Sequence, residues 1–331
     1  MSRGDIFEAL EREFGDTNGG GSRTVLVWGG KTGWIGQKLV SMINALGDGI
    51  TAQPAVSRME CRESVLQELE RVKPALAINA AGVTGRPNVD WCEDHKVETI
   101  RANVIGTLNL ADCCQLSGVH LTVFATGCIY SYDDARPEGS GVGFLETDEP
   151  NFKGSFYSLS KGMVDKLLTS FSNVLVLRVR MPISDDLSPR NFLTKISKYE
   201  KVVNIQNSVT CLYEMLPLSL IMMNRRLCGI FNFTNEGTVS HNECLDLYKE
   251  YIDSSYTYAN FTVAEQAKIL KADRSNNELS CAKIASALPD VWPLVPPGKE
   301  AIRGVFQRMR SHLEQQGNLP PKRTDIIRSS Q

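Results

Sequence analysis

One segment near the N-terminus constrains the fold more than any other. Residues 24–28 form a β-branched apolar run that leads into Gly30-Lys-Thr-Gly33-Trp-Ile-Gly36, and residues 35–46 then carry apolar side chains at helical spacing. Glycines in this pattern allow a tight turn, a close approach of the backbone to a ligand, and close packing of the helix on the strand. The segment predicts a βα unit whose helix N-terminus faces an anion. A glycine pattern alone is weak, because it also fits a purely structural turn.

The alternation continues along the chain. Further strands are expected at residues 75–79, 121–125 and 174–179, with helices at 64–71, 97–116 and 157–170 between and after them. This order predicts an α/β fold with a doubly wound parallel sheet, in which residues 23–180 form a dinucleotide-binding Rossmann domain.

The pattern becomes irregular after Arg180. A strand is expected at residues 230–234, and helices are expected near 242–251 and 263–270. We expect residues 181–308 to form a smaller, interleaved C-terminal portion that binds substrate and returns elements to the sheet.

Both ends of the chain are expected to lie outside the fold. Residues 1–22 combine a short charged helix at 5–14 with the run Asn18-Gly-Gly-Gly-Ser22, which is typical of a flexible leader. Residues 309–331 become rich in Gln, Pro, Lys, Arg and Ser without apolar periodicity, so a disordered tail is expected there.

Charge and hydropathy exclude several classes of partner. The chain of 331 residues has 36 basic and 38 acidic residues, so no global field favours a nucleic acid or an anionic membrane. A hydrophobic content of 42% supports a substantial core, yet no window approaches the roughly 18 apolar residues of a membrane span.

Cysteine and histidine usage points to a reducing compartment and to a protein without a metal. The nine cysteines form no CxxC pair, which fits reduced thiols and a cytoplasmic location. None of the four histidines lies in a metal-ligand spacing, so no metal site is expected. Those histidines are His95, His120, His241 and His312.

The glycine loop and two later segments are the candidate cofactor site. Arg58 follows the expected second strand, and a cation there favours the 2'-phosphate of NADPH; Glu60 lies so close in sequence that NADH stays possible. The small residues after the strand at 75–79 let the chain pass close to the cofactor riboses, or they form a simple turn. The candidate contacts are Gly30, Lys31, Thr32, Gly33, Trp34, Ile35, Gly36, Arg58, Asn79, Ala80, Ala81, Gly82 and Asn103, together with Tyr157 and Lys161.

Tyr157 and Lys161 are the candidate reductase pair. They lie four residues apart on an expected helix, so both side chains share one face. A nearby cation favours the phenolate, and we expect it to lower the pKa of Tyr157 toward neutral pH. Thr126, at the end of the preceding strand, would hydrogen-bond the carbonyl oxygen that receives the phenolic proton. Taken alone, the spacing also fits a surface pair.

The sequence resembles the extended short-chain dehydrogenase/reductase superfamily over nearly all of residues 24–306. Four segments are similar to the bifunctional 3,5-epimerase/4-reductases that complete UDP-rhamnose synthesis. They begin at Gly82, Ala125, Arg178 and Arg190 and read GVTGRPNVDWC, ATGCI, RVRMP and RNFLTK. The resemblance implies inversion of C3 and C5 of UDP-4-keto-6-deoxyglucose and reduction of C4 with NADPH, which gives UDP-β-L-rhamnose.

The resemblance also implies a second pair of catalytic groups. Cys128 lies in the ATGCI segment, where the related GDP-fucose synthase is similar and uses cysteine with histidine; here Lys195 would replace the histidine. A base on one face and an acid on the other would invert a carbon beside the ketone, because enolate formation acidifies its proton. Which group is base and which is acid stays open, and either side chain could instead be structural.

Eight residues are candidates for substrate binding, six of them in the four similar segments and two in residues 274–279, which resemble the family's C-terminal nucleotide-sugar segment. A diphosphate needs local cations, although any one arginine could instead close a salt bridge. The candidates are Arg86, Asn88, Trp91, Arg180, Arg190, Asn191, Arg274 and Asn277.

Two alternatives remain beside the bifunctional enzyme. One is a monofunctional dTDP- or UDP-4-keto-sugar reductase, and the other is a non-catalytic NADP-binding regulatory subunit, which the family also contains. Superfamily members commonly dimerise through the helices expected at 97–116 and 157–170, so a homodimer is expected. An upstream 4,6-dehydratase is the expected pathway partner.

Overall fold

The computed structural model describes residues 5–15, 23–47, 49–86 and 88–317. Its centre is a parallel sheet with the strand order β10-β5-β4-β3-β1-β2. The strands are β1 (Arg23–Trp28), β2 (Ile50–Pro54), β3 (Leu76–Asn79), β4 (His120–Thr126), β5 (Val174–Val179) and β10 (Gly229–Asn232). The chain leaves β1 in one direction to β2 and returns past it to β3, so the predicted doubly wound sheet is confirmed.

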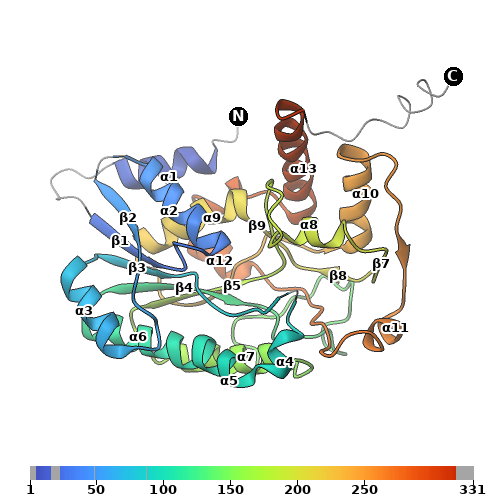
Figure 1. Ribbon diagram of the computed structural model, residues 1–331. Helices are drawn as coiled ribbons and strands as arrows, with labels where there is room; N and C mark the ends of the chain where they lie inside the picture. Colours follow the sequence, from blue (N-terminus) through green and yellow to red (C-terminus); the bar gives the residue numbers. More distant parts are fainter. Residues whose placement is uncertain (1–4, 16–22, 48, 87, 318–331) are drawn as a thin grey trace.

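Helices cover both faces of the sheet (Figure 1). Along β1, Val25 and Val27 pack on one face, whereas Leu26 and Trp28 pack on the other, so the strand is apolar throughout. The first face carries α1 (Ile6–Gly15), α2 (Trp34–Ala45), α9 (Leu212–Asn224) and α12 (Ala282–Ala287). The second carries α3 (Arg62–Val72), α6 (Gly106–Leu116) and α7 (Phe156–Leu168).

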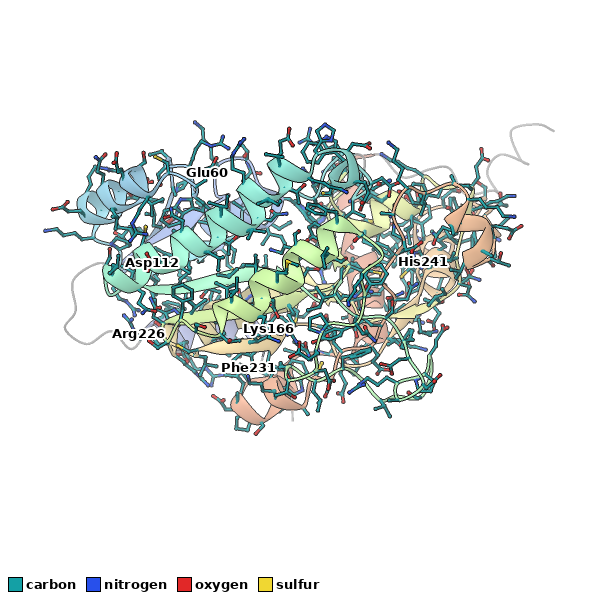
Figure 2. All side chains as sticks on the ribbon, turned by 90° about the horizontal axis from the view of Figure 1, so that it is seen from below. Glu60, Asp112, Lys166, Arg226, Phe231 and His241 are labelled. Carbon is teal, nitrogen blue, oxygen red and sulfur yellow. The ribbon has the colours of Figure 1, made fainter. Side chains whose placement is uncertain are left out.

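The helix expected at 97–116 is built from three consecutive pieces. These are α5 (Lys96–Thr99), the π-helical turn η1 (Ile100–Ile105) and α6. Figure 2 shows this run beside α7, with Asp112 and Lys166 marking the two helices. A π-helical turn inside a helix often marks a functional position, and this one carries the candidate cofactor residue Asn103.

A second, smaller core lies beyond the carboxyl ends of the strands. It packs the short α8 (Phe192–Ile196) with α10 (His241–Tyr251) and α13 (Gly298–Gln315). Shorter elements complete this half of the chain. They are β6 (Pro182–Ile183), β7 (Lys201–Val202), β8 (Gln206–Asn207), β9 (Thr210–Cys211), β11 (Val239–Ser240), β12 (Ala259–Asn260), α11 (Val263–Ala267) and η2 (Trp292–Leu294), with α4 (Trp91–Asp94) in the first half.

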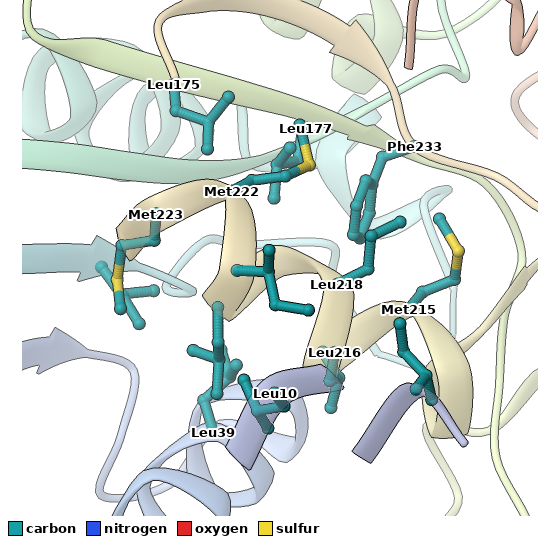
Figure 3. Close-up of a cluster of buried hydrophobic side chains, with 14 of the residues drawn as sticks. Leu10, Leu39, Leu175, Leu177, Met215, Leu216, Leu218, Met222, Met223 and Phe233 are labelled. Atoms are coloured by element: carbon teal, nitrogen blue, oxygen red, sulfur yellow. The ribbon is translucent and has the colours of Figure 1, made fainter. Parts of the chain in front are cut away.

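The expected flexible leader is wrong for residues 5–15. These residues form α1, and its apolar side chains Ile6, Leu10 and Phe14 are buried against α9. Figure 3 shows Leu10 near Leu216 of α9, while Met222 and Phe233 lie on the sheet side of the same cluster. The prediction of a flexible leader relied on the charged residues of this helix and overlooked that its apolar residues recur on one face. Residues 16–22 lie outside the described part of the chain.

The expected disordered tail is wrong for residues 309–317. Helix α13 continues to Gln315, and Met309 and Leu313 are buried in the second core. The polar residues of this stretch occupy the exposed side of the helix, which composition alone does not reveal. Residues 318–331 lie outside the described part of the chain.

Within the described residues, no helix combines the length and the apolar content needed to cross a membrane.

Candidate active site

The glycine loop between β1 and α2 is as tightly built as the sequence predicts. A Cβ on Gly33 would lie 2.7 Å from the carbonyl oxygen of Gly29, and a Cβ on Gly36 would also clash with that oxygen. The first N–H groups of α2 have no acceptor within the helix and face outward from Gly33, its N-cap. The glycines therefore let the loop fold closely on itself at the start of α2, where free N–H donors lie.

Gly29 is a loop residue that the sequence reading missed. Its φ is +84°, and a Cβ there would lie 2.7 Å from the carbonyl oxygen of Ala80. Only glycine fits both conditions. The doubled glycine after Trp28 is the signal that could have revealed it.

A buried carboxylate fixes the backbone of the turn after β2. Glu68 of α3 accepts hydrogen bonds from the backbone N–H groups of Val56 and Ser57, the latter at 2.8 Å. Arg58 follows in an exposed position, where its guanidinium pairs with Glu60 at 2.6 Å. Arg58, which favours NADPH, and Glu60, which favours NADH, thus form one ion pair after β2.

Asn79 and Asn103 shape the loop after β3. The side chain of Asn79 accepts a hydrogen bond from the N–H of Ala81, and Asn103 bonds both the N–H and the carbonyl of Val83. A Cβ on Gly82 would approach Asn103 Oδ1 at 3.2 Å. Asn103 thus fixes the backbone of this loop at Val83, next to Gly82.

Thr126 and Tyr157 meet at the carboxyl end of β4. The Thr126 hydroxyl contacts the phenol of Tyr157 and also accepts a hydrogen bond from the N–H of Cys128. Ser155 caps α7 by accepting from the N–H of Ser158, so the first turn that carries Tyr157 is fixed. Thr126, Cys128 and Tyr157 are therefore adjacent at this point.

The expected lowering of the Tyr157 pKa is wrong for this structure. Burial raises the pKa of Tyr157, and the nearby Cys128 adds to the rise, while contact with Thr126 opposes it. Burial also lowers the pKa of Lys161. Desolvation is the largest cause of both shifts, so Tyr157 is a neutral phenol that can donate a proton.

Asp165 is a further residue that the sequence reading missed. It lies one turn beyond Lys161, and its charge raises the Lys161 pKa against the effect of burial. Its carboxylate pairs with Arg178 of β5 at 2.6 Å, and both side chains are almost fully buried. The spacing of four between Tyr157, Lys161 and Asp165 is the signal that places all three on one face of α7.

Cys128 contacts a cation, but that cation is Arg180 rather than Lys195. Arg180 Nη1 lies 2.7 Å from the Cys128 sulfur. Arg180 Nη2 donates to Asn207 Oδ1 and to the carbonyl of Ser275. The guanidinium is therefore held inside the protein beside the candidate epimerase residue.

Lys195 lies on α8, half-buried among apolar neighbours. Burial lowers its pKa, and the nearby charge of Arg190 lowers it further. Among the described residues no hydrogen bond or ion pair holds its ammonium, and none joins it to Cys128. The structure therefore does not place Lys195 against the Cys128 sulfur.

The other candidate substrate residues divide into two groups. Arg190 is half-buried and, among the described residues, donates one side-chain hydrogen bond, to Thr84, whereas Arg274 pairs with Asp90 at 2.8 Å. Asn191 caps α8 and binds the carbonyls of Ser184 and Asp186. Among these residues, Arg190 is the cation that remains available to an anionic ligand.

Asn277 has a structural place beside the centre. Its amide donates to the carbonyls of Gly127 and Tyr130, which fixes the loop that carries Cys128. Asn191 therefore caps the helix that carries Lys195, and Asn277 bonds the loop that carries Cys128. Their burial could not be seen in the sequence.

The loop after β3 holds the last three candidates. Arg86 is exposed. Asn88 accepts from the N–H of Asp90, and Trp91 stacks on His95 with ring centroids 3.9 Å apart. Asp90, which pairs with Arg274, ties this loop to the C-terminal half, so the two sides of the candidate substrate cleft are linked.

A family comparison agrees with this arrangement. The RmlD substrate binding domain model matches residues 23–290. The chain belongs to this family. Its match begins at β1 and runs past α12, so it includes the glycine loop, Thr126, Tyr157 and both arginines of β5 and its end.

Curated relatives narrow the group within the family. The chain is 56% identical over 296 residues to the bifunctional dTDP-4-dehydrorhamnose 3,5-epimerase/dTDP-4-dehydrorhamnose reductase of Arabidopsis thaliana, covering 88% of this chain and 96% of that one. It is 57% identical over 263 residues to a trifunctional UDP-glucose 4,6-dehydratase/UDP-4-keto-6-deoxy-D-glucose 3,5-epimerase/UDP-4-keto-L-rhamnose-reductase of the same plant, covering 79% of this chain and 39% of that protein. The expected membership of the epimerase/reductase group is confirmed.

Solved structures support the same fold. The L780 UDP-rhamnose synthase from Acanthamoeba polyphaga mimivirus is 38% identical, with a TM-score of 0.81 over 87% of this chain and all of that one. A dTDP-4-dehydrorhamnose reductase from Bacillus anthracis is 19% identical, with a TM-score of 0.73 over 88% of this chain and 99% of that one. The second likeness carries the fold alone.

Proposed function

We propose that this protein inverts C3 and C5 of UDP-4-keto-6-deoxyglucose and reduces C4 with NADPH, which gives UDP-β-L-rhamnose. The observation that carries the proposal is the meeting of Thr126, Cys128 and Tyr157 at the end of β4. A hydroxyl, a thiol and a phenol at one point suit proton transfer both at carbon and at the ketone oxygen. The names of the similar relatives include both activities.

The cofactor site supports a dinucleotide. The glycine loop packs so closely that a Cβ at Gly33 or Gly36 would clash with Gly29, and helix α2 begins there with N–H donors suited to a pyrophosphate. NADPH, when bound, supplies the hydride for C4. Arg58 is placed to meet a 2'-phosphate, so NADPH is the proposed cofactor, and Glu60 leaves some use of NADH possible.

The reduction uses the pair on α7. Tyr157 donates its phenolic proton to the C4 oxygen, and Thr126 orients that oxygen through a hydrogen bond. Lys161, with Asp165 behind it, stabilises the phenolate that forms and contacts the cofactor ribose. A buried phenol with a raised pKa keeps its proton until the ketone oxygen becomes negative.

The epimerisation uses Cys128 and Lys195. The C4 ketone acidifies the protons on C3 and C5, so a base removes a proton to give an enolate and an acid returns one to the opposite face. Arg190 is the proposed contact for the diphosphate, since among the described residues its guanidinium donates one side-chain hydrogen bond, to Thr84.

The exposed helices α5 to α7 support a homodimer. Leu159, Met163 and Leu167 are spaced by four along α7 and are 37%, 56% and 50% exposed. Val97 and Ile105 are exposed on the neighbouring helix run (Figure 2). An apolar stripe of this kind suits a self-complementary contact. We place the dimer in the cytoplasm, supplied with the 4-keto sugar by a 4,6-dehydratase.

The first test mixes the protein with UDP-4-keto-6-deoxyglucose and NADPH, follows NADPH absorbance, and assigns the product by NMR. UDP-β-L-rhamnose supports the proposal, whereas a reduced sugar that is not inverted at C3 and C5 leaves a monofunctional reductase. The same assay with the dTDP sugar determines the nucleotide preference.

A second test separates an enzyme from a binder. Tyr157→Phe removes the proton donor, so we expect reduction to fall by about 10²- to 10⁴-fold while NADPH binding persists. A variant that keeps full reduction would contradict the assignment of Tyr157.

A further inference from the structure

Arg180 is a fixed, buried cation at the end of β5. Its side chain belongs to a residue that is 2% exposed, and its backbone is bonded to Thr210 through both N–H and carbonyl. The next residue, Met181, has a φ of +37° and precedes Pro182, a conformation that a methionine rarely adopts. Such strain persists where the surrounding structure requires it, and here it follows the residue that reaches Cys128.

The charge of Arg180 has no carboxylate partner among the described residues. Asn207 and the Ser275 carbonyl are neutral acceptors, and Arg180 Nε is buried without a hydrogen-bond partner. Arg178, two residues earlier on the same strand, is neutralised by Asp165. A buried cation is costly unless an anion compensates it. Cys128 is the neighbour in contact with Arg180 that can become an anion.

We propose that Arg180 holds the Cys128 sulfur as a thiolate for epimerisation, instead of binding the substrate diphosphate as the sequence suggested. This role rests on the proposed function of the site. Arg180 is then a positioning residue that acts through Cys128. A guanidinium hydrogen bond to an anionic sulfur is a charge-assisted contact, which is stronger than a bond between neutral groups.

The geometry opposes the diphosphate role. Nη1 and Nη2 already donate to Cys128, Asn207 and Ser275, so a phosphate would have to displace these acceptors. Arg190 is half-buried, and the side-chain hydrogen bond recorded for it among the described residues goes to Thr84. The two arginines therefore have different roles: Arg180 contacts Cys128 in the reaction centre, and Arg190 is the proposed contact for the substrate phosphates.

The proposal assigns a direction to the proton transfer. The Cys128 thiolate takes a proton from C3 or C5, so an S–H bond forms as the C–H bond breaks, and the electron pair moves to the C4 oxygen of the enolate. A protonated acid on the opposite face then gives its proton to the carbon as the ketone re-forms. The Lys195 ammonium suits this part, and both groups regain their starting forms by proton exchange with water.

The first test measures the sulfur directly. Iodoacetamide alkylation at pH 7 is followed by mass spectrometry at Cys128, with the exposed Cys228 of the same molecule as internal standard. We expect Cys128 to react at least about tenfold faster than Cys228, because the thiolate is the nucleophile. Arg180→Gln should remove that advantage, and Arg180→Lys should restore part of it. Equal rates for Cys128 in all three proteins would overturn the proposal.

The second test separates the two half-reactions. Deuterium uptake at C3 and C5 is measured in D₂O without NADPH, and reduction is measured with the sugar already inverted at both carbons. In Arg180→Gln, uptake should fall about tenfold more than reduction, with the KM for reduction changed less. An equal rise of KM in both assays would identify a phosphate contact and refute the role at Cys128.

Folding and the proposed function are checked separately. Thermal unfolding and NADPH binding establish that the variants are folded, and the wild-type comparison of Cys128 with Cys228 decides the case if Arg180→Gln does not fold. Absence of deuterium uptake in the wild type would refute the epimerase function. The dependence of Cys128 alkylation on Arg180 would still decide whether the contact forms a thiolate.

Discussion

The buried carboxylate of Asp165 accepts two hydrogen bonds from Arg178, at 3.0 Å from Nε and 2.6 Å from Nη2. Asp165 lies one turn beyond Lys161 and raises the Lys161 pKa, which burial lowers. The pair therefore joins β5 to α7, and Asp165 also supports the charge of Lys161.

Replacing Asp165 by Asn tests both effects. The variant leaves Arg178 buried without an anion, which should lower the free energy of unfolding by about 3–5 kcal/mol. It should also shift the alkaline limb of reduction to lower pH, because the Lys161 pKa falls further and its positive charge is lost earlier. The raised pKa of Tyr157 keeps the phenol protonated in this range, so Lys161 determines the limb.

A matched control uses the exposed ion pair on the same helix. Lys166 and Glu149 lie 2.9 Å apart with both side chains largely exposed, so Glu149→Gln should change stability by no more than about 1 kcal/mol. Chemical denaturation and pH profiles of kcat/KM for both variants provide the comparison. An unshifted profile in a folded Asp165→Asn protein would remove Asp165 from the support of Lys161.

The ion pair between Arg58 and Glu60 determines the cofactor prediction. Arg58→Glu places a negative charge where a 2'-phosphate is expected, so the ratio of kcat/KM for NADPH to that for NADH should fall by about tenfold or more, equivalent to about 1.4 kcal/mol. Glu60→Gln removes the competing carboxylate and should raise the same ratio. If both variants keep the wild-type ratio, neither residue contacts the adenosine ribose.

Much of the sheet could be predicted because its strands are continuous apolar runs beside glycine-rich turns. The predicted strands at 24–28, 75–79, 121–125 and 174–179 each agree with the structure to within one residue at either end. Helix α9 was missed because it is apolar on nearly all sides and contains Pro217, so no amphipathic period marks it. Helices α1 and α13 were undervalued because charged residues alternate with their buried apolar ones along the sequence.

For the candidate site too, some features could be predicted from the sequence and others could not. The adjacency of Thr126, Cys128 and Tyr157 could be predicted because each lies at a fixed place relative to a strand end or a helix face. Partners contributed by distant segments could not, so the carboxylate behind Arg178 and the place of Arg180 at Cys128 emerged only from the fold. Sequence spacing does not reveal which of several arginines lies against Asp165 and which lies against Cys128.

The apolar stripe on α7 predicts how the dimer should respond to a charge. Met163 is 56% exposed in the middle of the stripe, so Met163→Arg should bury an unpaired cation in the proposed interface and shift the protein to a monomer. Light scattering coupled to gel filtration measures this mass. Val263→Arg is the control, because Val263 is 53% exposed on the distant α11. A monomeric wild type, or a dimer that survives Met163→Arg, would contradict this interface.

Helix α1 should contribute to stability through its buried face. Leu10 is 1% exposed and packs in the cluster shared with α2 and α9, so Leu10→Ala should lower the free energy of unfolding by about 2–5 kcal/mol, because it leaves a cavity. Glu11→Ala, at an exposed neighbouring position, should change it by less than about 0.5 kcal/mol. Urea denaturation of the two variants measures the difference. Since α1 lies on the face of the sheet that holds α2, which begins at the glycine loop, a destabilised α1 should also weaken NADPH binding at temperatures near the unfolding transition. Equal stability of the two variants would mean that α1 is not held against α9 in solution.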